Sequence, residues 1–189
     1  MSLFDKVLGK KHASTLWQSE PEFKIQLELD RHALCRCRIG DPIEWLSGLG
    51  PPEDSKALRE KSYCYYSRGV EIGEEDGKVA DFSVFWVDYL EQGFQPFEGL
   101  VTFRGRTVEL DFRTQEKEFR SLFGDPYWRD QDQEEIILFY EFQGDIEWQV
   151  EFTLQTSLTA IIVVCHPLMA DAEQRERYGV SIPWPPRRQ

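Results

Sequence analysis

The chain has 189 residues, 41% hydrophobic and 14% aromatic, a composition typical of a folded protein with a sizeable core. Its 34 acidic and 22 basic residues give a net charge of −12, which favours a basic protein partner and disfavours nucleic acid or an anionic membrane. No run approaches the ~20 apolar residues that span a bilayer, and the N-terminus lacks the charge order of a secretory signal, so we expect a soluble, cytoplasmic protein with reduced cysteines.

Residues 1–22 are interpreted as an N-terminal arm, and the regular pattern begins after it. Apolar residues at 23, 25, 27 and 29 alternate with polar ones, which predicts a strand with one buried face. A turn near 30–31 leads into a second predicted strand, 33–39. The alternation there would turn Arg36 and Arg38 inward, and a one-residue register change would instead bury Cys35, Cys37 and Ile39.

A short helix is predicted next. Asp41 is placed to accept from its first amides, Pro42 suits its first position, and Glu44 would complete a capping box. Gly50 ends the helix. Strands are then expected at 63–66, 70–72 and 79–87, with a turn at 76–77, which together form a three-stranded meander.

The same order of signals returns 74 residues later. Without a gap, an offset of 74 aligns residues 23–52 with 97–126, and five positions are identical: Phe23/Phe97, Glu44/Glu118, Ser47/Ser121, Gly50/Gly124 and Pro52/Pro126. The second copy has predicted strands at 101–103 and 107–112, a turn at 104–105, and a helix capped by Thr114 and ended by Gly124. Its apolar face is expected to include Leu122.

The second meander is predicted at 136–142, 146–154 and 158–165. Strict alternation across 146–154 predicts that Glu147, Gln149 and Glu151 face water. The fold class is therefore α+β, a tandem duplication in which each copy is an antiparallel sheet packed on short helices. The expected units are an arm (1–22), repeat one (23–92), repeat two (93–168), and a C-terminal helix with a proline-rich tail (169–189).

No phosphate-binding glycine loop, HExxH or GxSxG motif is present, so we expect a binding protein without a cofactor rather than an enzyme. Cys35 and Cys37 could supply two ligands of a zinc site, but such a site needs two more ligands, and we interpret the pair as small buried core residues. The acidic run at 130–135 lacks the glycine of a calcium loop. We expect no metal site.

The aromatic residues outside the strand pattern are the candidate partner-binding residues. Tyr127, Trp128 and Arg129 follow the second helix with Asp130 and Asp132, and the first copy has no aromatic counterpart there. Trp184 lies in the tail, where folding back over a gap between the repeats is an equally simple reading. Exposed Trp and Tyr beside charges are typical of interface hot spots.

The helix exit Leu122-Phe123-Gly124 with Pro126, followed by a meander and present twice, resembles the beta-lactamase inhibitor protein fold and the SmpA/OmlA envelope lipoproteins. The resemblance covers about 41–87 and 114–165; in those relatives a helix-loop-helix opens each repeat, whereas a hairpin does here. It implies a concave sheet surface with hairpin loops that enter a partner enzyme. The acidic turn of Glu74, Glu75, Asp76 and Gly77 has the position of such a loop.

The sequence thus predicts a protein-binding module, in its sharpest form a cytoplasmic immunity or inhibitor protein for a basic toxin or enzyme. The alternative is a small-ligand binder or hydrolytic enzyme that uses carboxylates such as Glu147 and Glu151 in a cleft between the copies. A third alternative is a subunit of a larger assembly.

Overall fold

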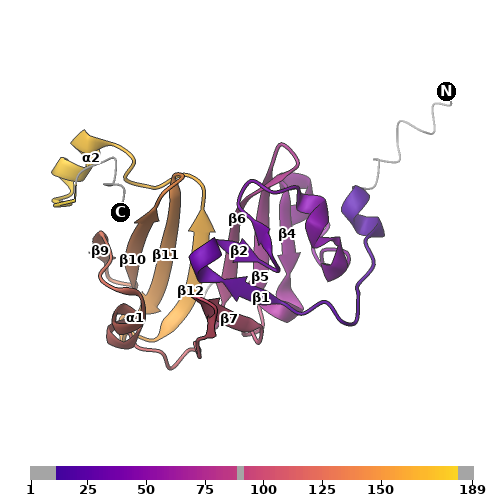
Figure 1. Ribbon diagram of the computed structural model, residues 1–189, viewed down its shortest axis with the longest axis horizontal. Helices are drawn as coiled ribbons and strands as arrows, with labels where there is room; N and C mark the ends of the chain where they lie inside the picture. Colours follow the sequence, from indigo (N-terminus) through magenta and orange to yellow (C-terminus); the bar gives the residue numbers. More distant parts are fainter. Residues whose placement is uncertain (1–11, 89–91, 183–189) are drawn as a thin grey trace.

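Two β-sheets and a few short helices make up the computed structural model, which describes residues 12–88 and 92–182 (Figure 1). The seven-stranded sheet extends along the long axis, and the five-stranded sheet lies in front of its middle in this view. The architecture is α+β with a duplicated arrangement, as the sequence predicts. Among the described residues, no helix is both long and apolar enough to cross a membrane.

The five-stranded sheet contains one hairpin from each copy, in the order β3-β2-β1-β7-β8. Its strands are β1 (Gln26–Glu28), β2 (Ala33–Leu34), β3 (Cys37–Arg38), β7 (Leu100–Phe103) and β8 (Arg106–Thr107). At its centre β1 and β7 pair in parallel, and Leu27 is the partner of Val101. Their separation is the repeat offset of 74 (101 − 27), so equivalent residues of the two copies lie side by side.

The seven-stranded sheet joins the two meanders and is antiparallel throughout. Its strands in spatial order are β4 (Ser62–Tyr65), β5 (Val70–Glu75), β6 (Lys78–Phe85), β12 (Leu158–Val164), β11 (Ile146–Thr153), β10 (Glu135–Phe142) and β9 (Trp128–Gln131). The copies meet where β6 pairs with β12. Each sheet therefore contains strands of both copies, and neither copy has a sheet of its own.

Short helices connect the strands. They are the 3₁₀ helices η2 (Ala13–Leu16), η3 (Leu29–Arg31), η4 (Ile43–Leu49), η5 (Ala57–Glu60) and η6 (Tyr66–Arg68), and the α-helices α1 (Glu116–Phe123) and α2 (Ala172–Arg177). One cluster of buried residues fills the space between the sheets and includes Leu27, Tyr63, Phe119 and Trp148.

The predicted helix caps are wrong in detail. The first helix is the 3₁₀ helix η4, and the Asp41 carboxylate accepts from the amide of Arg38 at 2.8 Å, so it closes a turn before the helix instead of capping it. In α1 the cap is Gln115 rather than Thr114, and Gln115 forms a capping box with Glu118. Leu122 of α1 is exposed, whereas Phe119 is buried.

The predicted strand 33–39 is interrupted by a tight turn. Cys35 and Arg36 have φ values of 53° and 67°, and the flanking residues pair as Leu34 with Cys37. This two-residue reversal buries both Leu34 and Cys37, which resolves the conflict between the two possible registers. The predicted turn at Arg104-Gly105 is confirmed, but regular pairing after it ends at Thr107 rather than 112.

The prediction that the outer face of β11 is wet is wrong. Glu147 is fully buried and Glu151 is 7% exposed. Residues 166–182, which follow β12, cover Glu147, whose carboxylate accepts a hydrogen bond from the Leu168 amide; we call this segment the C-terminal strap. The strap contains α2, which begins after Asp171 and ends before Gly179, as the sequence predicts.

Candidate functional site

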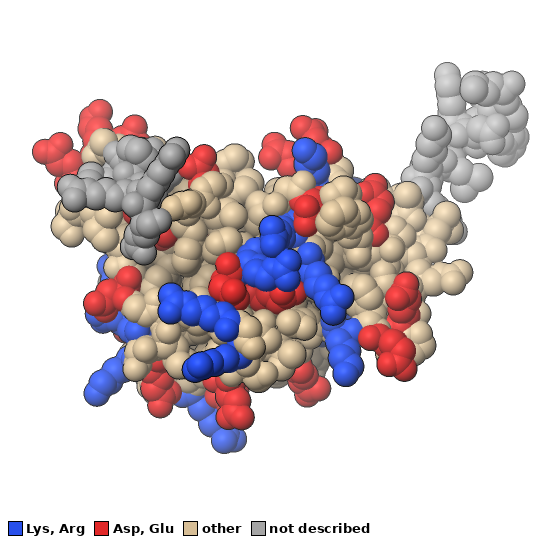
Figure 2. Space-filling view, viewed as in Figure 1, with Lys and Arg blue, Asp and Glu red and all other residues tan. Residues whose placement is uncertain are grey.

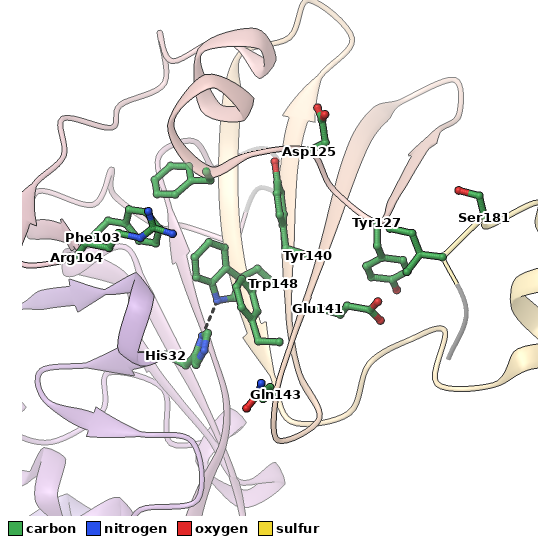
Figure 3. A pocket seen from close by; sticks show the side chains of 13 residues that line it. His32, Phe103, Arg104, Asp125, Tyr127, Tyr140, Glu141, Gln143, Trp148 and Ser181 are labelled. Atoms are coloured by element: carbon green, nitrogen blue, oxygen red, sulfur yellow. Dashed lines mark hydrogen bonds between the residues drawn. The ribbon is translucent and has the colours of Figure 1, made fainter. Parts of the chain in front are cut away.

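An open groove of about 900 Å³ lies on the described surface. It lies between the end of β7, the end of α1, the β10–β11 turn and the last residues of the C-terminal strap (Figure 3). Its lining residues are His32, Phe103, Arg104, Phe123, Asp125, Tyr127, Tyr140, Glu141, Phe142, Gln143, Trp148, Ser181 and Ile182. We call this feature the aromatic groove.

Aromatic rings form most of its apolar wall. Phe103 and Phe123 meet edge to face with centroids 4.9 Å apart, and the Phe142 and Trp148 centroids are 4.3 Å apart. Phe103 ends β7 and Phe123 ends α1, while Phe142 and Trp148 lie on either side of the β10–β11 turn. Rings that pack on one another lose little freedom on binding, so this wall is preorganised for another apolar or aromatic group.

His32 ties the first copy to this wall. Its Nδ1 accepts a hydrogen bond from the Trp148 indole Nε1 at 2.9 Å, so the neutral ring carries its proton on Nε2 (Figure 3). Burial lowers the His32 pKa to about 4; nearby Asp30 opposes this shift and Arg38 reinforces it. The imidazole is therefore uncharged at neutral pH.

The carboxylates in the lining already have cationic partners. Asp125 pairs with Arg120 at 2.5 Å, and Glu141 pairs with the buried Arg175. Arg104 lies with its guanidinium carbon 4.9 Å from the Phe103 ring centroid, and no carboxylate within residues 12–88 or 92–182 forms an ion pair with it. The uncompensated charge of the lining is therefore positive.

Arg104 is one of several arginines in the strands and turns of the five-stranded sheet. Segment 31–40, which contains β2 and β3, and segment 100–108, which contains β7 and β8, together have five arginines and no acidic residue; one of these arginines, Arg31, pairs with Glu28 of the neighbouring β1. Figure 2 shows basic side chains gathered over the centre of this face, with several acidic ones among them. The turn that follows β1 and the turn that follows β7 lie at the same end of the sheet because these strands are parallel.

Two buried charged residues attach the C-terminal strap beside the aromatic groove. Glu147 accepts hydrogen bonds from the Tyr127 hydroxyl at 2.7 Å and from the Leu168 amide at 3.2 Å. Arg175 donates to the carbonyls of Met169 and Ile182 and to the Glu141 carboxylate, and lies 4.5 Å from the Tyr127 ring centroid. These contacts compensate charges that would otherwise be costly to bury.

The predicted partner-binding residues do not form one surface. Tyr127 is buried at 8% exposure, and Trp128 stacks on Phe139 with centroids 4.6 Å apart, so both pack against the sheet. Arg129 pairs with Glu116 at 3.0 Å. Asp130 and Asp132 are exposed; Asp132 closes the β9–β10 turn by accepting from two amides.

The acidic turn lies elsewhere, between β5 and β6. Glu74 is largely buried, where it accepts from the Tyr63 hydroxyl at 2.8 Å, while Glu75 and Asp76 are exposed. This turn and the β10–β11 turn share one end of the seven-stranded sheet, and Asp132 lies at the opposite end. Trp184 lies outside the described residues. A role in partner binding remains a prediction for all of these residues.

The cysteines show no sign of an activated thiol. Burial raises the pKa of Cys35 to about 11 and that of Cys37 to about 12, so both remain protonated near neutral pH. Cys35 lies in the turn and Cys37 in β3, not on one face of a strand. Within the described part of the chain, no group of three or more His, Cys, Asp or Glu side chains is arranged to hold a metal ion.

Sequence reasoning missed the aromatic groove because its residues carry no motif. Phe103, Phe142 and Trp148 occupy alternating apolar positions of strands, where core packing is the ordinary interpretation. They are brought together because β7 and α1 pack against the meander of the same copy, with His32 added from the first copy, and no local pattern encodes this packing.

No protein-family model matches the sequence, and no curated protein matches it significantly. Among solved structures it is similar to a DUF4309 family protein (YjgB) from Bacillus subtilis subsp. subtilis str. 168. That similarity has a TM-score of 0.43 and 11% sequence identity, and it covers 64% of this chain and 75% of the other.

Proposed function

We propose that this protein is a non-catalytic binding module and that the aromatic groove is where it holds a protein partner. One observation carries the proposal: preorganised rings line an open groove of about 900 Å³, and its carboxylates are already paired with arginines. Aromatic, concave surfaces concentrate the energy of protein interfaces. Among the described residues that line the groove, both carboxylates are paired, which leaves no pair of free carboxylates there for acid–base chemistry.

In its narrower form the proposal is a cytoplasmic immunity or inhibitor protein that neutralises a basic toxin or enzyme. The net charge of −12 supports it, since exposed carboxylates attract the nearby cationic groups of a basic partner. The exposed carboxylates of Glu75, Asp76, Asp130 and Asp132 would contribute to that attraction.

The test is a capture experiment from the native cell with the full chain and two matched variants. Phe103→Thr removes a ring from the groove wall, and Phe112→Thr removes an exposed ring outside it. We expect the native chain and Phe112→Thr to retain one stoichiometric protein that Phe103→Thr loses. Equal capture by all three chains, or no stoichiometric protein at all, would exclude the groove as a protein-binding site.

A small-ligand binder is the second candidate, because the groove volume lies within the range of small-molecule pockets, about 300–1,000 Å³. Native mass spectrometry of the purified chain distinguishes the two. A mass increment of a few hundred daltons that Phe103→Thr abolishes would favour this second function.

The hydrolytic form of this alternative has less support. Glu147 and Glu151 are buried on the outer face of β11, and neither lines the groove. A hydrolase would require a carboxylate that can reach both substrate and water.

A further inference from the structure

We propose that the occupant of the aromatic groove is an extended peptide segment of the partner, which pairs with the free end of β10. On this proposal, one aromatic side chain of the segment enters the groove and one acidic side chain, two residues away, meets Arg104. The inference rests on the proposed protein-binding function and specifies the mode and chemistry of binding.

The first supporting observation is a strand without a neighbour. β10 runs from Glu135 to Phe142, but its register with β9 ends at Phe139. Within the described residues, Tyr140, Glu141 and Phe142 pair with β11 on one side and have no strand partner on the other. A free strand end offers backbone donors and acceptors to an added strand.

This free end lies inside the groove. Tyr140, Glu141 and Phe142 all belong to its lining, and the chain around Asp125 and Tyr127 leaves β10 where an added strand would lie. Figure 3 shows Phe103 and Arg104 on one side of this space and Tyr127 and Ser181 on the other. A peptide backbone along β10 would therefore have side-chain sites on both sides.

The residues that line the groove favour particular side chains in the bound peptide. Alternate residues of an extended peptide point to the same side, so an aromatic residue and an acidic residue two positions apart would both face the hairpin side. There the partly exposed rings of Phe103 and Phe123 would receive the aromatic side chain. The guanidinium of Arg104 lies directly over the Phe103 ring, within reach of the acidic one.

The charges in the groove lining favour an acidic rather than a basic residue as the second peptide side chain. Glu141 and Asp125 are neutralised by Arg175 and Arg120, and His32 is uncharged, so Arg104 is the lining charge without an ion-pair partner among the described residues. An acidic group there would gain a charge-assisted hydrogen bond. This contact is compatible with a partner that is basic overall, because charges more than about 10 Å away are screened by salt.

The test is a titration of the full chain, labelled for amide NMR, with a capped heptapeptide of sequence TSFTEST. The matched peptide carries lysine in place of glutamate. We expect the largest shifts at residues 103–104 and 140–142, and about tenfold tighter binding of the glutamate peptide. Arg104→Glu should reverse that preference, whereas Arg113→Glu, whose guanidinium lies over the Phe112 ring outside the groove, should leave it unchanged.

Backbone pairing has its own readout. Alternate amides of a paired peptide face the neighbouring strand, so of two versions with alternate amides N-methylated, one should lose binding and the other should retain it. Equal loss with both versions, or with neither, would overturn the added strand. Shifts that map elsewhere, equal affinity of the glutamate and lysine peptides, or absence of binding up to millimolar peptide would overturn the inference as a whole.

Two further outcomes separate this inference from the proposed function. If free N-acetyl-phenylalanine binds as tightly as the peptide, the occupant is a small aromatic acid and the peptide assignment fails. If Phe103→Thr abolishes partner capture but no peptide binds, the groove is the interface and only the binding mode proposed here is wrong.

Discussion

The Trp148 indole donates a hydrogen bond to His32 Nδ1 at 2.9 Å, across 116 residues of sequence. Trp148 is fully buried in the second meander, and His32 ends the turn after β1, so this bond joins the two copies at the wall of the aromatic groove. The bond requires a neutral imidazole, because a protonated ring has no lone pair to accept with.

Stability should therefore fall when His32 is protonated. The pKa is about 4 in the folded state and about 6.5 in the unfolded state, so the unfolded chain binds the proton first as pH falls. The His32 contribution is complete above about pH 6.5 and is lost between about 6.5 and 4. Because the ring is only partly buried, we expect a loss of about 1–2 kcal/mol.

Denaturant unfolding of the native chain and of His32→Asn, at pH 7.5 and pH 5, measures this loss. Asn tolerates the left-handed conformation of residue 32 (φ 49°, ψ 49°) and does not titrate. The native chain should lose about 1–2 kcal/mol more than the variant between the two pH values. An identical loss in both chains would contradict the assignment.

Arg175 should be the most sensitive position of the C-terminal strap. Arg175→Met leaves Glu141 buried without its cation and frees two carbonyls, so we expect about 3–5 kcal/mol of destabilisation by denaturant unfolding. Arg177 on the same helix forms an exposed pair with Glu173, and Arg177→Met should cost no more than about 0.5 kcal/mol. Similar costs at the two positions would mean that the strap is not held by Arg175.

The hydroxyl group of Tyr127 should stabilise the folded protein. Tyr127→Phe removes a donor from the buried Glu147 carboxylate, and we expect a loss of about 1–3 kcal/mol. Tyr178→Phe, at a position 56% exposed, should have little effect. In the capture experiment, reduced partner binding by a folded Tyr127→Phe would instead support the direct interface role that the sequence suggested.

Two glycines with similar backbone angles should respond very differently to alanine. Gly69 has φ 63°, and a Cβ there would lie 2.4 Å from the Gln95 carbonyl oxygen and 2.8 Å from the Phe97 nitrogen, so backbone must move. Gly77 has φ 77° with open space around it, so Gly77→Ala should cost only about 1–2 kcal/mol. Thermal unfolding should show a clearly larger loss for Gly69→Ala; equal losses would contradict this packing of residues 95–97 on η6.

Much of the local structure follows from the sequence. Strict alternation predicts β11, glycine marks the end of α1 at Gly124, and Asp171 with Gly179 delimits α2. The offset of 74 predicts more than the repeat itself, because the same offset relates the paired residues of β1 and β7. These features depend on neighbours in the chain or on the similarity of the two copies, and a sequence contains both.

Tertiary structure alone decided what lies on the faces of these elements. Alternation indicates that Glu147 and Trp148 face opposite sides of β11, but not that the C-terminal strap covers the polar side and buries Glu147. The sequence predicts an exposed Tyr127, but in the structure its hydroxyl donates to Glu147 and its ring packs against the guanidinium of Arg175. The aromatic groove likewise exists only because β7, α1 and the C-terminal strap pack around the β10–β11 turn, with His32 of the first copy beside them. Burial and cavities depend on contacts between segments far apart in sequence, and no pattern within one segment records which distant segment will cover it.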